Sequence, residues 1–281
     1  MQNASRKQTH EQEKSMRKDS NIAWTGPTWN PVSGCNKINT GCDNCYAFTF
    51  AERFRGVRGN YYENGFDLKL RPTQLEIPKR WREHRKIFVN SMSDLFHKDI
   101  PFDYLERVYE TMKLCPQHIF QILTKRPEPM RRLVPKLTIP PLSNVWYGVT
   151  IENDSATWRA DMLRETPAAI RFLSLEPLLG PLPSLNLDGI DWAIVGGESG
   201  HGARPMDLSW VRDLRDRCVS AGVPFFMKQM GTVAARALNI PGKGEKPEEW
   251  PEEFRLREYP TSYDAEFYNQ IAASRMATTR S

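Results

Sequence analysis

The chain has 281 residues, of which 40% are hydrophobic and 26% are charged, and its formal net charge is +5. This composition is typical of a soluble globular protein and excludes a chain that is disordered throughout. No apolar run approaches the roughly 18 residues that are needed to span a bilayer, so we expect no contact with a membrane.

The two ends of the chain differ in composition from its middle. Residues 1–20 are polar throughout and have no apolar segment that would indicate a secretory signal, so we expect a disordered extension and a cytoplasmic protein. Residues 21–231 carry the regular patterns of one domain. Residues 232–281 are polar and rich in Pro and Glu, which predicts an appendage with an edge strand at Phe254–Tyr259 and a frayed tail.

Three of the five cysteines lie in the twelve-residue stretch GCNKINTGCDNC, residues 34–45, which we call the cysteine loop. They are Cys35, Cys42 and Cys45. Thiols that cluster in a reducing compartment indicate metal binding or catalysis before they indicate disulfides. Cys115 and Cys218 lie within apolar helical patterns and are expected to pack as small hydrophobic side chains.

The residues after the cysteine loop have the pattern of an amphipathic helix. An apolar stripe at i, i+3, i+4 and i+7 predicts a helix that packs on the core; its members are Ala47, Phe50, Ala51 and Phe54.

The densest basic stretch is KRWREHRK, residues 79–86. A solvated helix face is the favoured interpretation. A patch that contacts the phosphates of a nucleic acid is the alternative, since Lys and Arg supply sequence-independent affinity for nucleic acid. Trp81 within this stretch could stack on a base.

Apolar strand patterns alternate with helical patterns from residue 87 to residue 229. The predicted strands are Ile87–Asn90, His118–Leu123, Val145–Thr150, Ile170–Leu175, Asp191–Val195 and Val223–Met227, with a further strand at Thr28–Val32. The predicted helices cover Phe102–Leu114, a short segment after Pro127, a segment through Trp158 and Met162, and a segment that starts at the N-cap Asp207. This alternation predicts a (β/α) barrel, or a partial TIM-like barrel of about six to seven parallel strands. An open doubly wound sheet is the alternative.

Polar side chains follow every predicted strand, and in barrels this end of the strands builds the active site. They are Ser91, Ser93 and Asp94; Thr124 and Lys125; Thr150 and Glu152; Glu176; Glu198; and Lys228 and Gln229. The stretch GGESGHG at residues 196–202 lacks the spacing of a nucleotide-binding loop, but its glycines permit a close approach of the backbone to a ligand.

Three thiolates bind zinc or an iron–sulfur cluster, and a closed zinc site needs a fourth ligand. The candidates for that ligand are His84, His97 and Cys115. Without a fourth protein ligand, a [4Fe–4S] cluster would keep one iron open for a substrate or cofactor.

A cysteine loop that follows a first strand and leads into a (β/α) barrel resembles the radical S-adenosylmethionine (SAM) enzymes. The chain is more similar still to an uncharacterised bacterial and phage family of three-cysteine proteins. The segments that carry this resemblance are WTGPTWNPVSGC, GCDNCYA, FVNSMSDLFH, QILTKRP, VWYGVTIEN, RFLSLEPLLGP, VGGESGHGARPM and VPFFMKQMG.

The resemblance to radical SAM enzymes implies that Cys35, Cys42 and Cys45 ligate a [4Fe–4S] cluster whose fourth iron binds SAM. It implies reductive cleavage of SAM to a 5′-deoxyadenosyl radical, with electrons from a donor such as flavodoxin or ferredoxin. Candidate SAM contacts are Ser91, Ser93 and Asp94 after the second strand, together with Glu176, Gly196, Gly197 and Glu198. The substrate is unidentified, and a nucleic acid or nucleotide is the favoured class.

Two other functions fit the same residues. One is a nucleic-acid-binding protein that is stabilised by zinc. The other is an iron–sulfur redox or sensor protein that never cleaves SAM.

Overall fold

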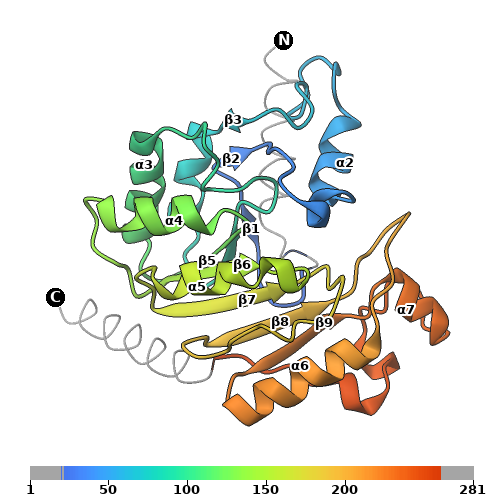
Figure 1. The fold of residues 1–281 in the computed structure, drawn as a ribbon. Coiled ribbons are helices and arrows are strands. Elements are labelled where there is room, and N and C mark those ends of the chain that lie inside the picture. The colour runs from blue at the N-terminus through green and yellow to red at the C-terminus, as the bar shows by residue number, and fades with distance from the viewer. Residues whose placement is uncertain (1–19, 21, 261–281) are drawn as a thin grey trace.

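The computed structural model describes Ser20 and residues 22–260, and at its centre is a sheet of seven strands (Figure 1). All of its neighbouring strands pair in parallel. The strands are β1 (Thr28–Trp29), β4 (Lys86–Val89), β5 (Ile119–Thr124), β6 (Val145–Thr150), β7 (Ile170–Leu175), β8 (Trp192–Gly196) and β9 (Phe225–Gln229). The six strands predicted after the cysteine loop are therefore confirmed.

The order of these strands distinguishes a barrel from a doubly wound sheet. They lie side by side as β1-β4-β5-β6-β7-β8-β9, so each new strand joins the same growing edge. A doubly wound sheet reverses its direction of growth at a switch point, and this sheet does not. It curls into half of a barrel, which confirms the expected partial barrel.

The first predicted strand, Thr28–Val32, is wrong in its second half. Pairing with β4 ends at Trp29, and Val32–Ser33 forms β2, which pairs antiparallel with β3 (Lys69–Leu70) in a separate two-stranded sheet. Pro31 lies between the two segments and has no N–H to donate to a ladder, which explains the break.

The predicted helices after β4 are confirmed with small changes of boundary. They are α3 (Phe102–Lys113), α4 (Pro127–Leu133), α5 (Trp158–Arg164) and α6 (Leu208–Ala221), and a short α7 (Thr232–Ala237) follows β9. Asp207 caps α6 as predicted, because its carboxylate accepts a hydrogen bond from the Ser209 N–H (2.8 Å). Single turns of 3-10 helix cover Thr40–Cys42, Pro72–Glu76, Pro78–Arg80, Val134–Lys136, Asp154–Ala156, Pro247–Glu249 and Glu252–Phe254. Within the described ranges, none of the helices combines the length and the apolar character that crossing a bilayer requires.

The helix after the cysteine loop, α2 (Tyr46–Glu52), stands apart from the other helices (Figure 1). Ala47 and Ala51 are buried as predicted, but Phe50 is 44% exposed and Phe54 lies beyond the end of the helix. The predicted stripe is thus only half buried, because α2 covers the cysteine loop and not the main sheet.

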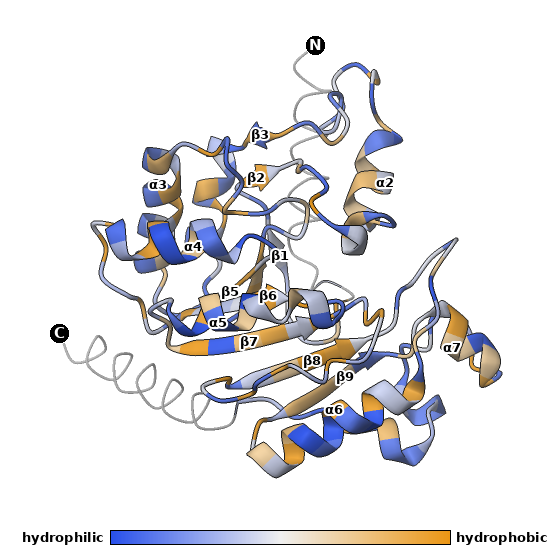
Figure 2. Cartoon of the chain, in the orientation of Figure 1, coloured by the Kyte–Doolittle hydropathy of each residue, from blue (hydrophilic) through white to orange (hydrophobic). Residues whose placement is uncertain are grey.

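Alternate residues of each strand face two separate cores. Ala193 and Val195 of β8 belong to a core that also contains the buried side chains of α3–α6. Trp192 and Ile194 point the other way, into a second core without helical residues, as the two-residue period of a strand requires. This second core fills the concave side of the half-barrel, and its members are Trp24, Phe88, Ile119, Trp146, Ile170, Phe172, Trp192, Ile194 and Phe226. Figure 2 shows β7, β8 and β9 coloured mainly as hydrophobic, as expected for strands that are buried on both faces.

The concave core depends on one glycine and on both ends of the described chain. A Cβ at Gly148 of β6 would lie 2.4 Å from the ring of Phe172, so no larger residue fits there. Trp24 packs on Phe88 with ring centroids 4.9 Å apart, and the Tyr259 hydroxyl donates to the Ala23 carbonyl (3.2 Å). These end segments cover the concave aromatic core from its open side.

The predicted edge strand at Phe254–Tyr259 is wrong as a strand. Only one antiparallel bridge forms there, between Phe226 and Arg257, and the segment starts with a 3-10 turn. Trp250 and Phe254 are fully buried in the core beneath it, and two backbone hydrogen bonds with β9 also hold the segment: the Met227 N–H donates to the Leu256 carbonyl (3.0 Å) and the Glu258 N–H donates to the Phe225 carbonyl (2.9 Å). The predicted N-terminal extension, apart from Ser20, and the predicted tail from residue 261 lie outside the described residues.

The basic stretch at residues 79–86 is not a helix. A single 3-10 turn ends at Arg80, and Lys86 already starts β4. Trp81 is buried, so the idea that its ring stacks on a base is wrong.

His118, just before β5, predicts a loss of stability in acid. It is fully buried, and its Nε2–H donates to the Pro78 carbonyl (3.1 Å), while within the described residues its Nδ1 has no partner. Burial lowers the pKa of His118 from 6.5 to about 4. The unfolded chain therefore binds more protons between these two values, and the free energy of unfolding should fall by up to about 3 kcal/mol as the pH drops through this window. Urea unfolding across this pH range tests the effect, and an equally steep loss in His118→Gln would contradict it.

Candidate functional site

The start of the cysteine loop is fixed by backbone contacts that require a glycine. Gly34 has a φ of +87°, and a Cβ there would lie 2.2 Å from the Asp67 carbonyl oxygen. The Gly34 N–H donates to the Met92 carbonyl (2.9 Å), and the Ser93 hydroxyl donates to the Gly34 carbonyl (2.6 Å). Cys35 is thereby held beside the segment that follows β4.

The first of three carboxylates that hold the loop is Asp94, which follows β4. It is buried and accepts hydrogen bonds from the Thr124 hydroxyl (2.7 Å) and from Arg126 Nη1 (3.0 Å). Arg126 in turn donates to the Asn36 carbonyl (2.9 Å) and lies 3.3 Å from Cys35 Sγ. Asp94 therefore orients the guanidinium that contacts the first cysteine.

The second carboxylate is Glu152, which follows β6 and is completely buried. It accepts hydrogen bonds from Lys125, from Arg159 Nη1 (3.0 Å) and from Asn39 Nδ2 in the cysteine loop (2.9 Å). A Cβ at Gly41 would lie 2.4 Å from its Oε1, so the loop backbone rests directly on this carboxylate.

The third carboxylate is Glu198, which follows β8 and is also buried. It accepts from Asn44 Nδ2 (3.0 Å) and from Arg204 Nη2 (2.6 Å), and Arg204 also donates to the Thr40 carbonyl (2.9 Å). These hydrogen bonds lower the pKa of Glu198 against the opposing effect of its burial.

Asp94, Glu152 and Glu198, which we call the anchor carboxylates, follow alternate strands of the half-barrel and hold the start, the middle and the end of the cysteine loop. The sequence indicated them only as polar residues at strand ends. It did not indicate their partners in the loop, Asn39 and Asn44, or Arg204, which bridges to the loop. Partners that lie 113 to 164 residues apart in the chain leave no local pattern.

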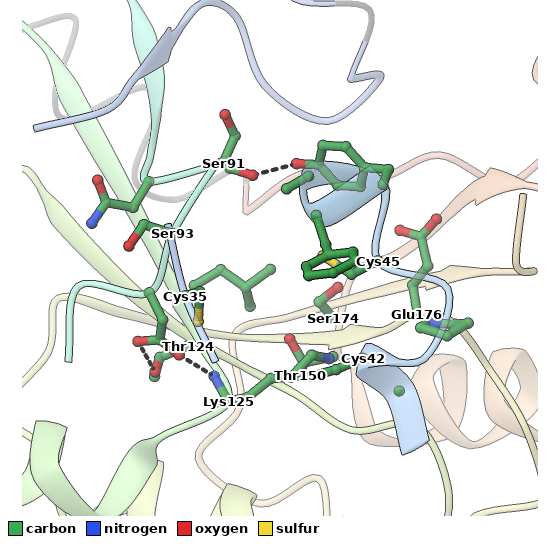
Figure 3. A pocket seen from close by; sticks show the side chains of 18 of the residues that line it. Cys35, Cys42, Cys45, Ser91, Ser93, Thr124, Lys125, Thr150, Ser174 and Glu176 are labelled. Carbon is green, nitrogen blue, oxygen red and sulfur yellow. Dashed lines mark hydrogen bonds between the residues drawn. The ribbon is translucent and has the colours of Figure 1, made fainter. Parts of the chain in front are cut away.

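A cavity of about 410 Å³ lies beneath the loop at the carboxyl ends of the strands (Figure 3). All three loop cysteines line it, and Figure 3 shows them around the same space as Thr150 and Ser174. Trp24, Phe88 and Leu123 give it an apolar wall that continues the concave core. An apolar cavity with a few convergent polar groups is typical of a small-molecule site.

The three loop cysteines are free and half-buried, whereas Cys115 and Cys218 are buried as predicted. Burial raises the pKa of the Cys35 thiol, and the Arg126 guanidinium opposes that rise. Within the described chain, no set of three Cys, His, Asp or Glu side chains is arranged to hold one metal ion.

None of the predicted fourth ligands lines the cavity as the structure describes it. Cys115 is in the helical core, and His84 contacts the Gln117 carbonyl (2.7 Å). His97 is buried, and its Nδ1 accepts from the Asp99 N–H (3.2 Å).

The residues predicted to contact SAM fall into two groups. Ser91, Ser93, Asp94 and Glu176 line the cavity, whereas Gly196, Gly197 and Glu198 are not among the residues that line it. The serine hydroxyls already donate to Asn30 and Gly34. A Cβ at Gly197 would lie 2.3 Å from the Met230 carbonyl oxygen, so close packing of two loops explains this glycine without a ligand.

Asn90 is a cavity residue that the sequence did not single out. It is 2% exposed, adopts a φ of +61°, and accepts a hydrogen bond from the Val32 N–H (3.3 Å). Its buried Nδ2 has no hydrogen-bond partner among the described residues. An unpaired buried amide donor is costly, and the residue that carries it lines the cavity.

Comparison with known proteins gives one match. The family model described as "Protein of unknown function (DUF5131)" matches residues 19–270, which is most of the chain. No curated protein and no solved structure matches the chain.

Proposed function

The chain belongs to the DUF5131 family, and we propose that it is an iron–sulfur enzyme of the radical SAM type. Cys35, Cys42 and Cys45 would hold a [4Fe–4S] cluster, and SAM would occupy the cavity beside them. The observation that supports this most is the placement of three thiols, without a fourth Cys or His among the described lining residues, at one cavity on the carboxyl side of a curled parallel sheet.

If bound, a [4Fe–4S] cluster with one open iron would supply the electron for cleavage of SAM to methionine and a 5′-deoxyadenosyl radical, and a flavodoxin or ferredoxin would supply that electron in turn. The protein's own residues would bind SAM and the substrate, orient them toward each other, and exclude water. Arg126 places a positive charge beside the Cys35 thiolate. The anchor carboxylates hold the loop that carries all three ligands.

The cavity offers matching groups for SAM. Asn90 Nδ2 is an unused donor that suits a carboxylate or a ribose oxygen. Trp24 and Phe88 provide an aromatic wall for an adenine ring, and they exclude water from the bottom of the cavity. Thr150 and Ser174, which carry hydroxyls, also line the cavity.

The test is metal analysis of protein that is purified and reconstituted without oxygen. We expect about four iron and four sulfide per chain, an electron paramagnetic resonance signal that changes when SAM is added, and 5′-deoxyadenosine after reduction. Stoichiometric zinc without iron, and no cluster on reconstitution, would overturn the proposal in favour of a zinc protein. A cluster whose spectrum ignores SAM, with no 5′-deoxyadenosine formed, would favour a redox or sensor protein.

A further inference from the structure

The wall of the cavity carries more positive than negative charge. Five basic side chains line it against two carboxylates, Asp94 and Glu176; the basic ones are Lys37, Lys125, Arg126, Lys228 and Lys243. Asp94 pairs with Arg126, and Glu176 pairs with Lys228. Lys125 shares its partner Glu152 with Arg159, so this carboxylate cannot neutralise both cations. A cluster on three thiolates and a bound SAM would together carry little net charge. They would therefore leave the excess positive charge of the cavity wall unbalanced, and another ligand of negative charge could balance it.

Part of this charge is gathered where β7, β8 and β9 end. Lys228 of β9 is half-buried, and its Nζ donates to Glu176 Oε2 (2.5 Å). The other oxygen of Glu176 accepts from Gln229 Nε2 (2.9 Å), so each oxygen of this carboxylate has a donor. An ammonium has three donors, and the described residues use only one of those on Lys228. The other two are available to the cavity.

Ser199 and Lys243 line the same cavity as Lys228, and backbone hydrogen bonds bring their loops to the residues just after β9. The Gly231 N–H donates to the Lys243 carbonyl (3.0 Å), and the Thr232 N–H donates to the Glu198 carbonyl (2.9 Å). Both loops therefore meet just after β9. Nothing in the described part of the chain hydrogen-bonds the Ser199 hydroxyl or its backbone N–H, and Lys243 pairs only with the exposed Glu245 (3.2 Å).

We propose that Ser199, Lys228 and Lys243 form a subsite that binds a phosphate group of the substrate. The inference rests on the proposed function, because it assigns a substrate class to the same cavity. Two ammonium groups, a hydroxyl and a free backbone N–H are the donor set that a tetrahedral oxyanion needs. A phosphate, with more charge than a carboxylate, matches the excess of positive charge on the wall. The substrate is accordingly a phosphorylated small molecule, of which a nucleotide is one example.

The experiment is isothermal titration calorimetry with inorganic phosphate, AMP and adenosine at low salt, on the full chain without a cluster. AMP should bind at least roughly tenfold more tightly than adenosine, because a hydrogen bond to a charged group contributes that much or more. Inorganic phosphate should compete with AMP. Lys228→Met and Lys243→Met should each remove most of this difference, whereas Lys113→Met, which removes an exposed lysine at the end of α3, should keep it.

Each outcome decides the proposal. Equal binding of AMP and adenosine, no competition by inorganic phosphate, or an equal loss in Lys113→Met would overturn the subsite. Lys228→Met also leaves Glu176 without its cation, so Lys243→Met and Ser199→Ala serve as the milder variants. If both of these variants keep the whole difference in affinity between AMP and adenosine, the subsite is likewise overturned. The assay needs no iron, so protein that binds iron but no phosphate refutes the subsite alone. Protein that binds phosphate but no iron or SAM refutes the proposed enzyme and leaves the subsite.

Discussion

Replacing Cys42 with serine should remove most of the iron and sulfide from protein reconstituted without oxygen, whereas Cys218→Ser should retain them. Cys42 is half-buried and lines the cavity, so its sulfur can reach a metal there. Cys218 is fully buried in α6, and burial raises the pKa of its thiol to about 12. Only a thiolate is a good ligand, and a serine hydroxyl is a poor substitute for it.

Iron and sulfide assays on the two variants measure this directly, and circular dichroism controls for folding. The two substitutions are chemically identical, so a difference in iron reflects position alone. If both variants hold as much iron as the native protein, the assignment of Cys42 as a ligand is wrong. Cys35→Ser and Cys45→Ser should behave like Cys42→Ser, since all three thiols line the cavity.

The second large effect is expected for Glu152→Gln, which should lower the free energy of unfolding by about 3–5 kcal/mol. Both oxygens of this buried carboxylate accept from donors, so an amide nitrogen in either position would face another donor. The substitution also leaves Lys125 and the buried Arg159 without their counter-charge. Breaking one side of a buried ion pair is far more costly than breaking an exposed one.

Urea unfolding measures the loss, and Glu165→Gln is its matched control. Glu165 also pairs with an arginine, Arg131, but both are exposed, so its loss should be within about 1 kcal/mol. A second readout is specific to the loop: the three loop cysteines should react faster with a thiol reagent in Glu152→Gln. Unchanged stability together with unchanged thiol reactivity would contradict the role of Glu152 as an anchor.

The main strands were predictable because each is a short apolar run that ends at a polar or turn residue. Val145–Thr150 and Ile170–Leu175 have the predicted boundaries. The prediction failed where a proline interrupts an extended run, as at Pro31, and where pairing stops at a single bridge, as at Phe254–Tyr259. Both failures concern pairing partners, which a local pattern does not contain.

The site was predictable only as a set of candidates. The spacing of Cys35, Cys42 and Cys45 indicated that they act together, and their position at one cavity agrees with that. The sequence did not distinguish Glu176, which faces the cavity, from Glu198, which holds the cysteine loop. Both are carboxylates just after a strand. The difference between them arises from their surroundings in the fold, which are the cavity for Glu176 and Asn44 of the cysteine loop for Glu198.

The sequence by itself determined the alternation of strands and helices, the position of the cysteine loop before them, and the burial of Cys115 and Cys218, because these follow from hydrophobic periodicity within a few residues. Only the tertiary structure decided that the sheet grows in one direction and curls, that Trp81 is buried, and that three carboxylates on alternate strands hold one loop. It also decided which polar groups find no partner among the described residues, such as Asn90 Nδ2. The physical reason is that hydrogen bonds and ion pairs between strand ends join residues far apart in the chain, so they depend on the order of the strands in the sheet and not on the residues beside them.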